Sequence, residues 1–130
     1  MKASVFLIRL GGAINLLVGI LHITFWSLFD WPVELAKLTV DNSNVVQMLN
    51  LFTIVFFFYT STALLYMPSK LLTTSTGRMF IGMLATLYLA RLAMEFYFPS
   101  GSIGFGAFLA ATVFLFALPL FRNKSLSHAS

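Results

Sequence analysis

Four separate apolar segments, each about as long as a bilayer's hydrocarbon core is thick, constrain this chain more than any other feature. A helix needs roughly 20 mostly apolar residues to cross that core. The segments cover about residues 5–29, 45–67, 79–98 and 103–121. Because backbone polar groups in lipid must bond within the chain, each segment is expected to be a helix. Short connections make neighbours antiparallel, so the sequence predicts an all-α, integral membrane, antiparallel four-helix bundle that forms one transmembrane domain over residues 1–130.

Composition agrees with a membrane protein and removes several classes of function. The chain is 59% hydrophobic and 9% charged, whereas a soluble domain carries about 25% charged residues. It has no Cys, which excludes thiol nucleophiles, redox thiols, disulfides and Cys-based metal sites. The basic residues stand singly at segment ends, so the net charge of +4 predicts no nucleic-acid partner. No P-loop, dinucleotide fingerprint or H-E-x-x-H is present, and no span pairs two His, so we expect no metal and no cofactor.

The first connection carries signals for helix starts. Asp30, with Pro32 close behind, predicts the N-cap of a helical piece over residues 33–38. Asn44, with Gln47 three residues later, resembles a capping box that opens the second span. The chain is therefore expected to return to the membrane at about residue 44.

The other connections are shorter or more polar. Pro68 is expected to end the second span, and residues 69–78 to form a polar loop that turns at 73–77. Pro99 stops the third span before a tight turn over 100–102, and residues 123–130 form a polar tail. At the other end, Arg9 inside the first segment and the lack of an A-x-A-like site favour a retained span over a cleaved signal peptide.

The flanking charges predict an orientation. The basic residues on the side that holds both termini and the 69–78 loop are Lys2, Arg9, Lys70, Arg78, Arg122 and Lys124. The opposite side has Lys37 and the four acids Asp30, Glu34, Asp41 and Glu95. The positive-inside rule places both termini in the cytoplasm, in a multi-pass protein of the cell (inner) membrane whose first partner is the lipid bilayer. Trp26, Trp31, Tyr97 and Phe98 are expected to form the outer aromatic belt.

Polar residues from three spans are expected at one depth. His22, Asn50 and Arg91 each lie about 8–11 Å below the outer surface of the hydrocarbon, at roughly 1.5 Å per residue. Arg91 and Glu95 are four residues apart and share a helix face, with Glu95 expected closer to water. A charge at this depth is expensive unless it is paired, faces protein or reaches water. We therefore expect these side chains to face one another or a wet cavity.

Helix periodicity places each polar residue on a face. The first span carries the stripe Gly12, Asn15, Gly19, His22 and Trp26. The second carries Gln47, Asn50, Ile54 and Ser61, and the third carries Leu84, Tyr88, Arg91 and Glu95. Small residues in the fourth span are expected to form a packing surface, with Thr112 as its deep polar group: Gly104, Gly106, Ala107, Ala110 and Ala111.

Each polar feature has a structural and a functional interpretation. Arg91 and Glu95 form either a structural ion pair near the outer boundary or a site that handles a ligand or proton. His22 either hydrogen-bonds to Asn50 or a backbone carbonyl, or takes part in a site. Gln47 and Asn50 can equally be links between helices.

Several short motifs resemble one family. The motifs are Gly19-Ile-Leu-His22, Phe25-Trp, Asp30-Trp-Pro, Gln47-Met-Leu-Asn50, Leu71-Leu-Thr-Thr, Gly77-Arg and Leu89-Ala-Arg91 with Glu95. In these motifs the chain resembles a group of small bacterial four-span membrane proteins, loosely DoxX-like. The resemblance covers nearly the whole chain. It implies a four-helix inner-membrane protein and assigns no catalytic residues. The Cys of redox-type members is missing here, so thiol chemistry does not carry over.

Two classes of function follow from these features. The first is an accessory or structural subunit that packs against a second copy of itself or a larger membrane complex. The second is a protein whose outer-leaflet pocket binds or converts a small amphiphile, such as a lipid, quinone or isoprenoid-like molecule. In that case Arg91 binds an anionic or carbonyl oxygen of the ligand, and His22 and Glu95 transfer a proton. Gln47, Asn50 and Tyr88 orient the ligand. Neither class of function predicts a particular reaction.

Overall fold

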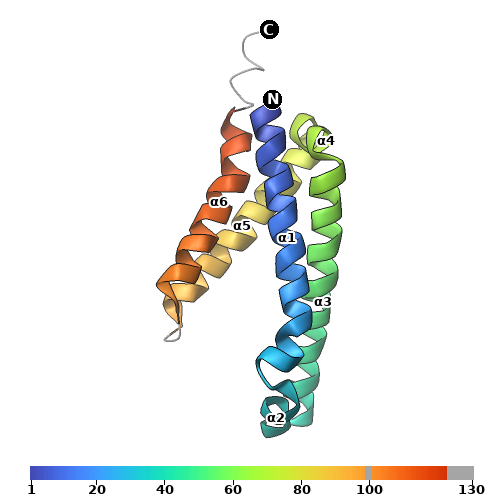
Figure 1. The fold of residues 1–130 in the computed structure, drawn as a ribbon, viewed down its shortest axis with the longest axis vertical. Helices are drawn as coiled ribbons and strands as arrows, with labels where there is room; N and C mark the ends of the chain where they lie inside the picture. The colour runs from blue at the N-terminus through green and yellow to red at the C-terminus, as the bar shows by residue number, and fades with distance from the viewer. Residues whose placement is uncertain (99–100, 123–130) are drawn as a thin grey trace. The chain divides into compact units, whose positions relative to one another are not determined.

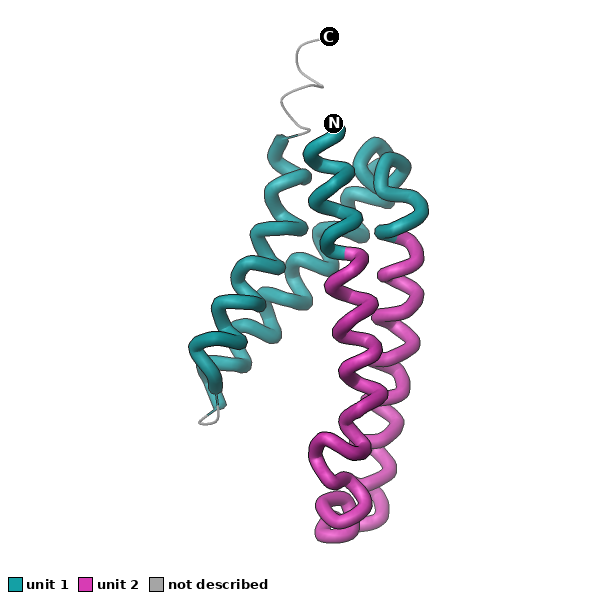
Figure 2. The backbone as a smooth tube through the Cα atoms, viewed as in Figure 1, with its two compact units in different colours: residues 1–11, 64–130 teal, residues 12–63 magenta. Residues whose placement is uncertain are grey.

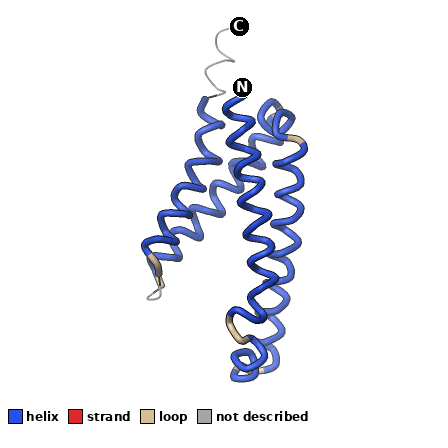
Figure 3. The backbone as a smooth tube through the Cα atoms, viewed as in Figure 1, coloured by secondary structure: helices blue, strands red, loops and turns tan. Residues whose placement is uncertain are grey.

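A computed structural model describes residues 1–98 and 101–122 of the chain. Four long helices dominate it (Figure 1): α1 (Lys2–Leu28), α3 (Val40–Tyr66), α5 (Ser75–Tyr97) and α6 (Ile103–Arg122). Over the described ranges 92% of the residues are helical and none is in a strand (Figure 3), which confirms the all-α fold class. The predicted stop at Pro99, Ser100 of the tight turn and the polar tail 123–130 lie outside the described residues.

All four long helices are long and apolar enough to cross a membrane. Each contains an 18-residue window with a mean hydropathy between 1.4 and 2.2, and the helices are 20 to 27 residues long. Because a bilayer core needs roughly 20 residues, every one of them meets the length requirement. The chain is a multi-pass membrane protein by this criterion.

Contacts within the chain define two compact units (Figure 2). Residues 12–63 form unit 2, which contains most of α1, the short α2 (Trp31–Glu34), the 3₁₀ turn η1 (Leu35–Lys37) and most of α3. Its two long helices run antiparallel. At Gly19 they approach so closely that an added Cβ would lie 3.2 Å from the Cβ of Phe57. The glycine predicted to admit a neighbouring helix therefore does so.

Unit 1 comprises residues 1–11 and 64–130. Within its described part, α5 and α6 form an antiparallel hairpin, and the short α4 (Pro68–Thr73) packs against α5. Gly106 of α6 lies against Phe96 of α5, where a Cβ would come within 2.9 Å of the ring. The fully buried apolar side chains of this unit are Ile8, Leu64, Leu72, Ile81, Leu84, Leu109 and Phe116.

Of two predicted helix caps, one is confirmed in position and the other is wrong. Asp30 occupies the N-cap position of α2 and Pro32 lies in its first turn, as predicted, although the Asp30 backbone is left-handed (φ 46°) and its side chain makes no capping hydrogen bond. The capping box fails because α3 already begins at Val40, so Asn44 and Gln47 lie inside the helix. Thr39 takes the cap position, since its Oγ1 accepts from the Asn42 amide and its carbonyl accepts from the Ser43 amide.

The 69–78 connection is more helical than predicted. Pro68 does end the second span, because α3 stops at Tyr66, but the same proline opens α4. Thr74 then caps α5, as its hydroxyl accepts from the Gly77 amide at 3.1 Å. The predicted polar loop is therefore a short helix followed by a helix cap.

The small-residue surface of α6 is only partly a packing surface within the chain. Gly106 and Thr112 are buried as predicted, and Ala110 is half-buried. Gly104, Ala107 and Ala111 are exposed. The buried face of α6 instead uses larger residues, because Leu109, Phe116 and Pro119 provide more apolar area to cover.

Candidate functional site

His22 and Asn50 form a two-point link between α1 and α3. The Asn50 amide nitrogen donates to the His22 backbone carbonyl at 3.1 Å, and the Asn50 Oδ1 lies 2.9 Å from the His22 Nδ1. Both helices place these residues on their shared face, as the stripe of the first span predicts. The sequence-based interpretation in which His22 bonds to Asn50 is therefore confirmed.

This link determines which nitrogen of the His22 ring carries the proton. A backbone carbonyl can only accept, so the Asn50 NH₂ must face it and the Asn50 oxygen must face the ring. Nδ1 then carries the proton and donates to Asn50, which leaves a lone pair on Nε2 of the neutral ring. Orienting partners of this kind set the tautomer of functional histidines.

Nε2 of His22 reaches the surface of the described structure. No buried side-chain nitrogen or oxygen in the described ranges lacks a hydrogen-bond partner. The hydrogen bond of the His22 ring runs through Nδ1, so Nε2 is an accessible acceptor. The ring itself is held between aromatic neighbours, with centroids 4.3 Å from Phe25 and 5.7 Å from Phe57.

A second polar link lies deeper in unit 2. The Asn15 side-chain amide donates to the Thr60 hydroxyl at 2.8 Å, and both side chains are buried. Thr60 in turn donates to the Phe57 carbonyl. Asn15 stands on the predicted stripe, whereas Thr60 was not among the expected site residues.

Arg91 and Glu95 pair as their spacing predicts, but the carboxylate has a further partner. Arg91 Nη1 lies 2.8 Å from Glu95 Oε2, and Glu95 Oε1 accepts from the Ser102 backbone amide at 2.6 Å. Within the protein the Glu95 side chain is 9% exposed and that of Arg91 is 48%, and their relative depth in a membrane stays a prediction. The Arg91 guanidinium also lies 5.2 Å from the centre of the Phe105 ring, a cation–π contact.

Glu95 and Arg78 both belong to α5 and bind opposite ends of α6. Ser102 precedes the first turn of α6, and its carbonyl accepts from the Gly106 amide. Glu95 thus brings negative charge to the N-terminus of α6. At the opposite end, Arg78 Nη2 donates to the Leu120 carbonyl at 2.7 Å. Acid at the N-terminus and base at the C-terminus both complement the helix dipole.

The remaining candidates have different surroundings. Gln47 donates its amide to Ser43, at 3.2 Å from both the carbonyl and the hydroxyl, so it links to its own helix. Tyr88 is buried in unit 1, with its ring stacked on Phe116 at 5.8 Å between centroids.

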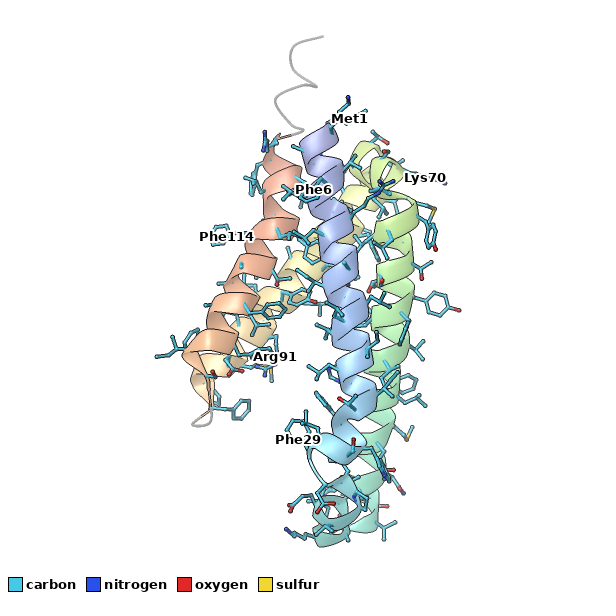
Figure 4. The ribbon with its side chains drawn as sticks, in the orientation of Figure 1. Met1, Phe6, Phe29, Lys70, Arg91 and Phe114 are labelled. Atoms are coloured by element: carbon cyan, nitrogen blue, oxygen red, sulfur yellow. The ribbon has the colours of Figure 1, made fainter. Side chains whose placement is uncertain are left out.

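The six candidates therefore fall into two groups. His22, Gln47 and Asn50 belong to unit 2, and Tyr88, Arg91 and Glu95 belong to unit 1. Figure 4 labels Arg91 on the α5–α6 hairpin. A single layer that unites both groups stays a prediction.

The described part of each unit contains a hollow. In unit 1 a hollow of about 260 Å³ is bordered by Arg91, Met94, Glu95, Phe98 and Gly101. In unit 2 an open groove of about 420 Å³ lies where α1, α2 and the start of α3 meet. Gln47 is the sequence-predicted candidate that borders this groove.

Three partners were missed from the sequence. Ser102 acts through its backbone amide, which residue type does not reveal. Arg78 was interpreted as a charge at the cytoplasmic boundary, and only the hairpin geometry brings it to the end of α6. Thr60 stands in an apolar helix where Thr commonly bonds to its own backbone.

Comparisons with models of protein families, with curated proteins and with solved structures find no match. The DoxX-like resemblance accordingly stays a prediction. Within residues 1–98 and 101–122, no group of three or more His, Cys, Asp or Glu side chains could hold a metal ion.

Proposed function

We propose that this chain is an accessory or structural subunit of a membrane assembly, formed with a second copy of itself or with a larger complex. One observation carries the proposal. Glu95, the acid with the strongest claim to chemistry, has both carboxylate oxygens bound within its own hairpin, by Arg91 and by the Ser102 amide. A carboxylate committed in this way stabilises α6 rather than a ligand.

Other contacts support the same role. Asn15 and Asn50 each join α1 to α3, and Arg78 joins α5 to α6. Large apolar side chains such as Phe114 and Phe121 are exposed on α6 and suit lipid or a neighbouring subunit. On α6 the exposed small residues Ala107 and Ala111 leave room for another helix to approach.

The orientation belongs to this proposal as well. Both termini lie in the cytoplasm and the α1–α3 connection faces outward, in the cell (inner) membrane. The proposed orientation is supported by the bases, because the α1–α3 connection has Lys37 alone whereas Lys70 and Arg78 lie between α3 and the second turn of α5.

The mass of the native particle tests the subunit role. The chain, extracted together with its surrounding lipid, is expected in particles that contain more protein than one 14.5 kDa chain. Since the chain has no Cys, Ala107→Cys can be used to cross-link the exposed face of α6, with Leu17→Cys on α1 as the matched control. We expect a specific cross-linked product from Ala107→Cys and none from Leu17→Cys. A particle that contains a single chain, with no cross-link from either variant, contradicts the proposal.

A second function, binding of a small amphiphile, is favoured by unit 2. The accessible lone pair on His22 Nε2 offers a hydrogen-bond acceptor in an otherwise apolar stretch of α1. The groove of about 420 Å³ is in the size range of small-molecule sites. This proposal covers binding and no reaction, because among the described residues the His22 ring is bonded to Asn50 and to no titratable side chain.

A further inference from the structure

The groove of unit 2 has two chemically different walls. One wall is apolar and comes from the end of α1, from α2 and from η1, with Trp26, Trp31 and Leu35. The other is a polar face at the start of α3, with Ser43, Asn44 and Gln47. A molecule that fits between them has an apolar part and a polar, hydrogen-bonding part.

A turn at Asp30 builds the aromatic wall. The left-handed backbone of Asp30 reverses the chain after α1, and α2 follows at once. The turn brings Trp31 against Trp26, with ring centroids 6.1 Å apart, and against Phe25, at 6.3 Å. Trp26 remains half exposed, at 50%, so a ligand can reach its ring.

The charges beside the groove select the sign of the ligand. The segment around it carries the acids Asp30, Glu34 and Asp41 against the single base Lys37. Glu34 is paired with Lys37, whereas Asp30 and Asp41 form no ion pair with any described residue. These acids flank the groove without bordering it, so they attract a cation to its surroundings, and the exposed Trp26 ring can bind one.

The polar wall can still make hydrogen bonds. Gln47 uses its NH₂ on Ser43, which leaves its Oε1 as an acceptor. Asn44 is exposed and its side chain bonds to no described residue, so it offers both donors and an acceptor. A headgroup that carries a cation and also an anionic oxygen finds partners for both.

We propose that this groove binds the ammonium-bearing headgroup of a zwitterionic phospholipid, with the ammonium on the exposed part of the Trp26 ring, beside the turn at Asp30. The lipid is chosen over a free amphiphile because the groove lies at the end of a predicted span, where headgroups are dense. Asn44 faces the phosphate oxygens. This assignment rests on the second proposed function, amphiphile binding.

The chain provides its own reporter for the test. Trp26 and Trp31 are its two Trp residues and both border the groove, so Trp emission reports occupancy. The full chain is placed in lipid discs of phosphatidylglycerol with a rising fraction of phosphatidylethanolamine of the same acyl chains. We expect a saturable change in emission as phosphatidylethanolamine rises, and no such change when an equal fraction of phosphatidylglycerol of another chain length is added.

Asp30→Asn is the decisive variant, because Asn also tolerates the left-handed backbone and removes only the charge. We expect the midpoint of the titration to rise by roughly fivefold, the effect of about 1 kcal/mol near a surface. Lys70→Gln removes a charge from the exposed part of α4 and is expected to leave the midpoint unchanged. Helical content by circular dichroism checks that each variant folds.

Each other outcome overturns a defined part of the proposal. If dodecyltrimethylammonium saturates the signal in phosphatidylglycerol discs and phosphatidylethanolamine does not, the occupant is a free cationic amphiphile and the lipid assignment is wrong. If dodecyl sulfate produces the same change, the preference for ammonium is wrong although amphiphile binding survives. If none of these probes alters emission, the groove binds no amphiphile and the second proposed function fails with it.

Discussion

The side-chain amide of Asn50 binds both the ring and the backbone carbonyl of His22. Because these two hydrogen bonds must form together, the link allows only one arrangement of the two side chains. An Asn at this position can be satisfied in only one orientation, because one of its two partners is a carbonyl that cannot donate. Hydrogen bonds between membrane helices are modest, at about 0.6 kcal/mol on average. The main effect of Asn50 is therefore to fix the helix register and the His22 tautomer.

Replacement of Asn50 by Ala tests both effects. We expect Asn50→Ala to lower the free energy of unfolding by about 1 kcal/mol, because two interhelical hydrogen bonds are lost. The ¹⁵N spectrum of His22 should change from one tautomer, with the proton on Nδ1, to a mixture. Unfolding by a denaturing detergent and solid-state NMR of labelled His measure the two quantities.

The matched control is Asn42→Ala, which removes an exposed amide that makes no bond between helices. It should leave both quantities unchanged. A His22 signal from the other tautomer in the unchanged protein contradicts the assigned orientation of the Asn50 amide.

Glu95 offers a graded test of its two roles. Glu95→Gln keeps an acceptor for the Ser102 amide and loses the ion pair with Arg91, whereas Glu95→Leu loses both. Since a hydrogen bond to a charged group contributes about 1.5–3 kcal/mol, we expect a loss of about 2 kcal/mol for Leu and a smaller one for Gln. Hydrogen exchange of the Ser102 amide reports on the bond itself. Equal losses from the two variants contradict the role of Ser102.

At the scale of elements, α5 holds α6 through one charge at each end. Arg78 and Glu95 are 17 residues apart on α5, about 25 Å along its axis. Because the two contacts share no partner, their contributions should add. We expect Arg78→Met to cost about 1 kcal/mol, and the double variant with Glu95→Leu to cost the sum within about 0.5 kcal/mol.

Detergent-induced unfolding of the two single variants and the double variant measures this sum. Lys70→Met, which removes an exposed base from α4, serves as the control and should be close to neutral. A double variant that costs no more than Glu95→Leu alone indicates that the C-terminal contact of Arg78 does not stabilise the hairpin.

The long helices could be predicted because each depends on one strong signal, an apolar run of spanning length. Their ends depend on weaker signals. Val40 to Asn44 are polar enough to suggest a loop, yet α3 includes them because Thr39 can cap it. Residues 68–73 have too few apolar positions for a visible period, although Pro68 is well suited to start a helix.

The candidate site was predictable where two side chains bond to each other. Depth and face together suggested His22 with Asn50, and spacing suggested Arg91 with Glu95. The second partner of Glu95 is a backbone amide, and Arg78 bonds to a carbonyl at the far end of another helix. Residue types do not reveal backbone partners, so these two contacts could be identified only from the three-dimensional structure.

At the scale of the whole molecule, the charge distribution makes a prediction about both sides of the membrane. The connection over residues 29–39 and the first turn of α3 hold the acids Asp30, Glu34 and Asp41, while Lys70 belongs to α4 and Arg78 to the first turn of α5. The positive-inside rule weighs Lys and Arg in short connections near span ends, here Lys37 alone on one side against Lys70 and Arg78 on the other. The α1–α3 connection should therefore be outside and the α3–α5 connection inside.

Single cysteines can test this orientation without a background, because the chain has none of its own. We expect a membrane-impermeant maleimide, added to intact cells, to label Asn42→Cys and not Thr76→Cys, since both positions are exposed but lie at opposite ends of α3, in the first turns of α3 and α5. Permeabilised cells should label both, which controls for the reactivity of Thr76→Cys. The reverse pattern overturns the orientation and, with it, the placement of the Trp26–Trp31 groove among outer-leaflet headgroups. Labelling of both in intact cells contradicts an odd number of membrane crossings between them, because α3 is the one long helix that separates the two positions.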